Sequence, residues 1–181
     1  MYQNTMTDTL LQRGRTPFRE LLRRALVFRL QEAQISFTPE EVSSLVGGWE
    51  RLQPYPDVKE GLGALKGRYL LAVLSNGDPD MLAKAVPGLG VPMDRVISSA
   101  QAGAYKPHPS VYLTAARLLG MEPSQVLHVA SHPFDLIGAK AAGLRTAYVD
   151  RHGTPFDETP YTPDLVVKEM RELAARLMSE R

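Results

Sequence analysis

The sequence predicts an α/β fold built on a doubly wound parallel sheet, with a helical region in front of it. From residue 57 onward, short apolar segments alternate with amphipathic segments of helical spacing. The apolar segments are hydrophobic on both faces, which is typical of parallel strands that helices cover on either side. Ligands of such sheets bind beyond the carboxyl ends of the strands, so functional side chains are expected just after each strand.

The first third of the chain is expected to be helical. Thr16 is followed by a proline, which favours the first turn of a helix, and the apolar residues after it recur with helical spacing. Thr38 predicts a second helix start, because Glu41 completes a capping box. The proline-rich sequence QPYPD that follows is typical of a hinge. We therefore divide the chain into a helical region, residues 1–53, and an α/β core, residues 54–181.

The core is predicted to alternate between strands and helices. Short apolar runs rich in β-branched and aromatic residues predict the strands, and glycines that follow periodic segments mark helix ends. The expected strands are 69–75, 95–99, 126–130, 145–149 and 164–167, and the expected helices are 58–66, 79–86, 109–119, 134–142 and one at the C-terminus.

Composition argues against several classes of function. The chain has 181 residues, with 21 Lys and Arg against 20 Asp and Glu, so its net charge of +1 gives no field that would attract nucleic acid or an anionic membrane. The absence of cysteine excludes disulfides and thiol chemistry. The longest apolar run, Tyr69 to Leu74, is too short to cross a bilayer, and the N-terminus has no signal-peptide pattern. We expect a soluble cytoplasmic protein that acts on a small molecule.

Polar residues follow the first two predicted strands. Ser75 and Asn76 end the first strand, although Asn-Gly-Asp-Pro is also ordinary turn chemistry. Lys106 follows the second strand, and Tyr112 falls on the first turns of the next helix. A single loop lysine is most often a solvated charge, so neither group indicates a site by itself.

A third group, Ser131, His132 and Asp135, follows the third predicted strand. Taken alone, Asp135 is explained by the preference for acidic residues in the first turn of a helix, and His132 as a surface residue. However, three successive strand ends here carry an amide, an ammonium group and a carboxylate, and in a parallel sheet they converge on one crevice. This combination indicates a binding site far more specifically than any one of its members.

The residues also occur in the order of a known family. The chain resembles the type II haloacid dehalogenases of the haloacid dehalogenase-like (HAD-like) hydrolase superfamily over nearly its whole length. The resemblance implies a Rossmann-like, HAD-like core and makes residues 1–53 a partial helical cap. It rests on Ser75-Asn76-Gly77, then Lys106-Pro107 with Tyr112, then Ser131 with Asp135 and the run GAKAAGLRTAYV.

The resemblance implies hydrolysis of short 2-haloacids through an aspartyl ester, with no cofactor. By it, Ser75 and Asn76 hold the substrate carboxylate. Lys106 pairs with the attacking aspartate, and an adjacent cation would keep that group ionised in a dry site. Asp135 orients Lys106 or the hydrolytic water, and Tyr112 belongs to the same polar network.

The third strand end departs from the family pattern. It contains Ala130-Ser131-His132 where many dehalogenases have Ser-Ser-Asn. Ser131 and His132 stay candidates for substrate binding, and His132 is expected to alter substrate preference. HAD phosphatases carry an acid at the position of Ser131 and bind Mg²⁺ there. Since Asp135 is the only acid left, metal-free attack at carbon is favoured, and a Mg²⁺-dependent phosphatase is the alternative.

The family carries its attacking aspartate at the end of the first, central strand. This sequence has no aspartate at a matching position. Asp8 lies in a polar segment that is unsuited to a buried strand and is better explained as part of a cap helix. Asp150 follows an apolar segment in the pattern Asp-x-x-Gly-Thr, yet it comes after the Asp135 motif, so a turn is favoured.

We therefore expect the chain to be N-terminally truncated relative to the family. The central strand would be missing, its two neighbours would face a gap, and the chain would be inactive as it stands. A non-catalytic relative that binds a small carboxylate or a partner protein is a second alternative. The resemblance is also compatible with a homodimer.

Overall fold

Two parallel ladders form the centre of the α/β core in the computed structural model, which describes residues 2–11 and 15–179. The predicted parallel sheet is confirmed, because every strand pair is parallel. In the described residues no ladder joins β1 to β3, so each of these strands is paired on one side only. The ladders are β1 (Ala72–Ser75) with β2 (Arg95–Ser98), and β3 (Leu127–Ala130) with β4 (Arg145–Val149) and β5 (Leu165–Val167).

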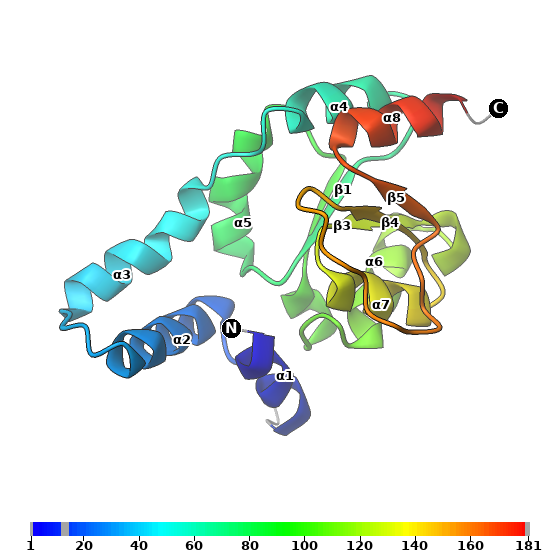
Figure 1. The fold of residues 1–181 in the computed structure, drawn as a ribbon. Helices are drawn as coiled ribbons and strands as arrows, with labels where there is room; N and C mark the ends of the chain where they lie inside the picture. Colours follow the sequence, from blue (N-terminus) through cyan, green and yellow to red (C-terminus); the bar gives the residue numbers. More distant parts are fainter. Residues whose placement is uncertain (1, 12–14, 180–181) are drawn as a thin grey trace.

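Helices cover both faces of the strands, as the apolar strand sequences predict. On one face α4 (Val58–Leu65) lies along α8 (Met170–Ser179), and their apolar residues form one cluster with β4 and β5 (Figure 1). On the other face, α6 (Pro109–Leu119) and α7 (Pro133–Ala141) form a second cluster. The doubly covered α/β arrangement therefore agrees with the sequence.

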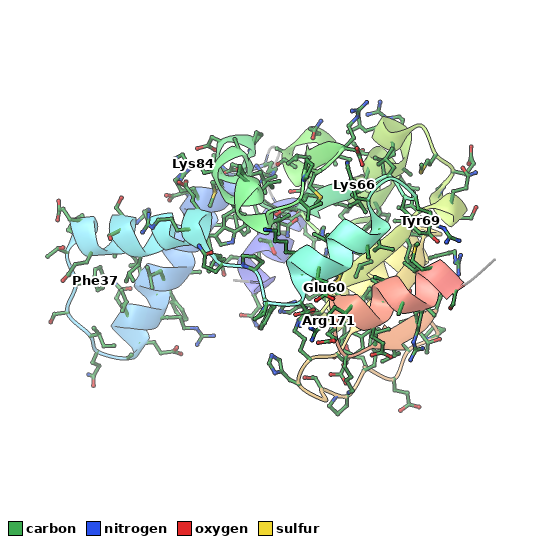
Figure 2. The ribbon with its side chains drawn as sticks, turned by 90° about the horizontal axis from the view of Figure 1, so that it is seen from above. Phe37, Glu60, Lys66, Tyr69, Lys84 and Arg171 are labelled. Carbon is green, nitrogen blue, oxygen red and sulfur yellow. The ribbon has the colours of Figure 1, made fainter. Side chains whose placement is uncertain are left out.

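The N-terminal part is helical, as predicted. It contains α1 (Tyr2–Leu11), α2 (Phe18–Glu32) and α3 (Pro39–Gly47). The antiparallel pair α2 and α3 extends away from the strands, with Phe37 at its far end (Figures 1 and 2). The predicted capping box of α3 is present, because Thr38 and Glu41 exchange side-chain to backbone hydrogen bonds. The remaining elements are α5 (Pro79–Ala85) and the short 3₁₀ helices η1 (Gly48–Arg51), η2 (Val86–Leu89), η3 (Ser99–Ala102) and η4 (Pro123–Gln125).

The start of α2 is stabilised from another element. The side chain of Pro17 cannot cap the helix, and Asp78 instead accepts hydrogen bonds from the backbone N–H groups of Phe18 and Arg19, each at 3.0 Å. Arg15 pairs with the same carboxylate at 2.8 Å. Asp78 precedes α5, so it connects the N-terminal helices to the end of β1. An apolar cluster supports the contact and contains Phe18, Leu21, Met81 and Tyr105.

The first strand is shorter than predicted. Residues 69–71 lie outside β1, because Tyr69 forms an isolated bridge with Lys66 and the N–H of Leu71 is bound by the side chain of Asp94. The other strands and helices of the core agree with the predictions to within one or two residues. None of the described helices is long and apolar enough to cross a membrane.

Candidate active site

Asp135, on the first turn of α7, is the centre of a buried polar cluster. Its Oδ2 accepts a hydrogen bond from Lys106 Nζ at 3.0 Å, and its Oδ1 accepts one from the Tyr112 hydroxyl at 2.8 Å. His128 Nε2 lies 3.0 Å from Oδ1, within ion-pair distance but without the alignment of a hydrogen bond. The side chains of Lys106, His128 and Asp135 are only 9%, 9% and 13% exposed.

The surroundings of Asp135 favour its ionised form. Burial alone would raise its pKa, but attraction to His128 and Lys106 and the hydrogen bond from Tyr112 outweigh burial, so the pKa lies well below its usual range. The position at the start of α7 acts in the same direction, because the helix dipole favours negative charge there. Asp135 is therefore a carboxylate at neutral pH, and it binds Lys106 as an ion pair.

Asn76 connects the end of β1 to Lys106. Its Oδ1 accepts a hydrogen bond from the backbone N–H of Lys106 at 3.0 Å, and its carbonyl oxygen accepts one from Arg15 at 2.8 Å. Ser75 is less directly involved, because its hydroxyl accepts a hydrogen bond from the N–H of Gly77 within the turn, at 3.1 Å. Three strand ends therefore meet as predicted, with Ser75 joined to Lys106 through its neighbour Asn76.

The space at position 77 admits only glycine. A Cβ at this position would lie 2.7 Å from the ring of Trp49, a distance that carbon atoms do not tolerate. The carbonyl oxygen of Gly77 also accepts a 2.6 Å hydrogen bond from the Ser98 hydroxyl at the end of β2. The turn after β1 is therefore fixed by both the helical region and the neighbouring strand.

Ser131 and His132 lie apart from this cluster. Both are exposed, and neither side chain takes part in the side-chain hydrogen bonds of Lys106 or Asp135; the carbonyl oxygen of His132 accepts the backbone N–H of Asp135 at 3.1 Å. The ring of His132 contacts Phe134 edge to face, with 6.0 Å between ring centroids. Their roles in substrate binding stay predictions.

His128 and Arg15 are the residues of the cluster that the sequence interpretation missed. His128 lies inside the apolar strand segment VLHVA, where periodicity assigns it to the core. It was the one polar side chain in that segment, and buried polar groups usually have a partner, so a signal was present. Arg15 gave no signal, since its contact with the turn after β1 spans 61 residues.

The two aspartates that were considered as nucleophiles lie elsewhere. Asp150 accepts hydrogen bonds from Lys168 Nζ at 2.6 Å and from the N–H of Thr154 at 2.8 Å, as the turn interpretation predicts. Asp8 belongs to α1, where its Oδ2 accepts a hydrogen bond from the N–H of Thr16 at 3.0 Å. In residues 2–11 and 15–179, Asp135 is the only carboxylate within ion-pair distance of Lys106.

Two further properties bear on the chemistry. Across the described part of the chain, no group of three or more His, Asp or Glu side chains is arranged to hold a metal ion. A cavity of about 540 Å³ lies between α2, α3 and the start of α5, lined by residues such as Arg19, Arg23 and Asp80. Neither Lys106 nor Asp135 lines this cavity, so the cavity is separate from the polar cluster.

Comparison with known proteins identifies one family. Residues 3–143 match the family model described as haloacid dehalogenase-like hydrolase. Haloacetate dehalogenase H-2 of Moraxella sp. strain B is 35% identical over 156 residues, which are 84% of this chain and 70% of that protein. (S)-2-Haloacid dehalogenase of Pseudomonas sp. strain YL is 34% identical over 157 residues, 85% of this chain and 68% of the relative.

A solved structure agrees in fold. L-2-haloacid dehalogenase from Xanthobacter autotrophicus, with chloropropionic acid covalently bound, superimposes with a TM-score of 0.87 at 29% identity. The match covers 99% of this chain and 82% of that one. The likeness therefore includes the N-terminal helices as well as the α/β core.

Proposed function

Because the chain belongs to the haloacid dehalogenase-like hydrolase family, we propose that its polar cluster at Lys106 and Asp135 serves hydrolytic dehalogenation of short 2-haloacids. The contact between these two side chains carries the proposal. It places a buried ammonium group at the carboxyl ends of the strands, where α/β proteins bind ligands. An anionic substrate and an attacking carboxylate both need such a cation.

Lys106 is suited to hold a further carboxylate. An ammonium group has three N–H donors, and Asp135 takes one of them among the described residues. Burial of Lys106 strengthens its attraction to an anion, because water screens the charge less. Ser75 and Asn76, at the end of β1, are the proposed partners of the substrate carboxylate, with Ser131 and His132 as candidate contacts at the rim.

The proposed reaction proceeds in two steps. An aspartate attacks the carbon that bears the halogen, forms an ester and releases halide with the bonding electron pair. Water then adds to the carbonyl carbon of the ester, which releases the 2-hydroxyacid and a proton and regenerates the carboxylate. Asp135 is proposed to orient Lys106 or this water, with Tyr112 holding Asp135. No step requires a cofactor.

The attacking carboxylate is proposed to come from outside the described residues. Asp135 is engaged by Lys106 and Tyr112, and Asp8 and Asp150 are held elsewhere by Thr16 and Lys168. We therefore expect the 181-residue chain to bind a 2-haloacid without turning it over.

Halide release tests the proposal. Chloride would be measured from (S)-2-chloropropionate with the 181-residue chain and with the same chain extended at its N-terminus by an apolar strand ending in Asp-x-x-Gly-Thr. We expect release only from the extended form, with loss of release after Lys106→Met. Asp150→Asn in the extended form is the matched control and should keep the activity. Enzymatic chloride release by the unextended chain would contradict the proposed origin of the attacking carboxylate, and no release from the extended form would contradict the proposed dehalogenation.

Mg²⁺-dependent phosphatase activity is the alternative to be checked in the same preparations. It predicts that Mg²⁺ raises the hydrolysis of a phosphate monoester, and one carboxylate is a poor site for that ion. A cytoplasmic location and a homodimer belong to the proposal as well. Fractionation of cells and light scattering of the purified chain would test these two points.

A further inference from the structure

His128 is a buried basic side chain that the proposed reaction does not yet use. It is 9% exposed, and its place in β3 directs it toward α6 and α7, while Leu127 and Val129 on either side pack against the α4 and α8 cluster. Its ring meets the ring of Tyr112 edge to face, with 5.4 Å between centroids. Its register partner on β4 is the neutral Thr146.

Each oxygen of the Asp135 carboxylate contacts a different basic side chain. Lys106 Nζ lies 3.0 Å from Oδ2, and His128 Nε2 lies 3.0 Å from Oδ1, the oxygen that also accepts from Tyr112. Among the described residues, Lys106 and His128 are the only basic groups within ion-pair distance of Asp135. The titratable groups in contact with His128 are thus Asp135 on α7 and Tyr112 on α6, and Lys106, in the loop before α6, contacts the other oxygen of Asp135.

Charge balance shows why a second basic group matters. Lys106 and Asp135 neutralise each other, so a further carboxylate would enter a neutral site, and a buried anion without a compensating cation is strongly disfavoured. His128 Nε2, 3.0 Å from Oδ1, gives Asp135 a second basic partner. Lys106 then retains charge and N–H donors for an incoming anion.

We propose that His128 is a positioning residue, which holds Asp135 at the oxygen that Lys106 does not contact and so leaves Lys106 able to bind a second carboxylate. The inference deepens the proposed function and rests on it for the identity of that carboxylate. A residue that only filled the core would pack its ring against Tyr112 and would not influence Asp135. The two roles make different demands on the side chain.

A pair of substitutions separates the two roles. His128→Phe keeps a flat ring and its contact with Tyr112 but removes the basic ring nitrogens. His128→Gln loses the ring but keeps an amide N–H that can reach the position of Nε2. If His128 positions Asp135, His128→Phe should disturb the ionisation of Asp135 more than His128→Gln does. If core filling is the role, the order should be reversed.

The ionisation of Asp135 is the direct readout, followed by ¹³C NMR of its side-chain carboxyl carbon. In the unaltered chain we expect Asp135 to stay ionised down to the pH at which the protein unfolds. His128→Phe should bring its titration into the folded range, at least one pH unit higher, and His128→Gln should lie between. An unchanged titration in the Phe variant would overturn the proposal. If that variant does not fold, an unchanged titration in the Gln variant would overturn it equally.

A binding measurement completes the test. Propionate, a probe without halogen, should bind the His128→Phe variant at least several-fold more weakly than the unaltered chain. Equal binding by both would contradict the proposal. Neither readout depends on halide release. A chain that shows the expected titration of Asp135 but never releases chloride in its extended form would therefore disprove the proposed function and leave the role of His128 standing.

Discussion

Gly138 of α7 lies so close to Pro107 that a Cβ on the glycine would be 2.6 Å from the proline Cβ. The same Cβ would lie 2.8 Å from the Tyr112 hydroxyl. The close approach of α7 to the loop after Lys106 is therefore a condition for the contact between Lys106 and Asp135. The short distance between two chain segments, and not only the polar side chains, builds the candidate site.

Gly138→Ala is predicted to separate α7 from this loop. Overpacking of this kind costs about 1–3 kcal/mol in free energy of unfolding. Gly63→Ala on α4 is the matched control, since a Cβ there meets nothing within 4 Å and alanine is favoured in a helix by about 1 kcal/mol. Urea unfolding of both variants checks the prediction. A Gly138→Ala variant as stable as the control would show that α7 is not tightly held.

The buried pair of Lys106 and Asp135 is predicted to be strongly coupled. Removing one partner of a buried ion pair leaves an uncompensated charge, at a cost of about 3–5 kcal/mol, whereas removing both costs less than the sum. A double-mutant cycle with Lys106→Met and Asp135→Asn would measure this coupling in the free energy of unfolding. Additive effects would mean that the two side chains do not interact in solution.

The pH dependence of stability is predicted to report on Asp57. Two hydrogen bonds from Arg151, at 2.8 and 2.9 Å, and one from the N–H of Met170 lower the pKa of Asp57 from 3.8 to about 2, against the raising effect of burial. The folded pKa lies below the unfolded one, so this contribution is present above about pH 4 and is lost as the pH falls toward 2.

Arg151→Met should therefore destabilise the protein at neutral pH by roughly 1–2 kcal/mol. The difference in unfolding free energy from the unaltered chain should shrink as the pH is lowered from 4 to 2. Chemical unfolding at a series of pH values makes the measurement. A difference that stayed constant across this range would disprove the assignment to Asp57.

Asp78 is predicted to determine where α2 begins. It binds the first N–H groups of the helix, and replacing such a capping side chain by alanine costs about 0.5–2 kcal/mol. Asp78→Ala should therefore destabilise the protein and increase hydrogen exchange at Phe18 and Arg19. Asp80→Ala is the control, because its ion pair with Arg19 is exposed and should contribute less than about 1 kcal/mol. Equal effects of the two substitutions would contradict this role.

Most helices and strands followed from local sequence signals. Thr38 and Glu41 identified the start of α3, and apolar segments identified the strands, because capping and burial depend on neighbours in the sequence. Residues 69–71 were wrongly assigned to β1, since the side chain of Asp94 takes the N–H of Leu71. The division of the chain at residues 53 and 54 stays a prediction.

The site was only partly predictable. The rule that ligands bind at strand ends brought Asn76, Lys106 and Asp135 together before the structure was known. It could not identify His128, which lies inside a strand and contacts Asp135 only because α7 folds back over β3. Nor could it identify Arg15, whose contact with the turn after β1 depends on how the N-terminal helices pack.

Binding of (S)-2-chloropropionate to the 181-residue chain, followed by NMR, tests the central claim most directly. The account predicts saturable shifts of the Asn76 amide and the Lys106 side chain, and their loss after Lys106→Met. Shifts confined to Arg19 and Arg23, at the cavity between α2 and α3, would contradict it, as would the absence of binding at Lys106.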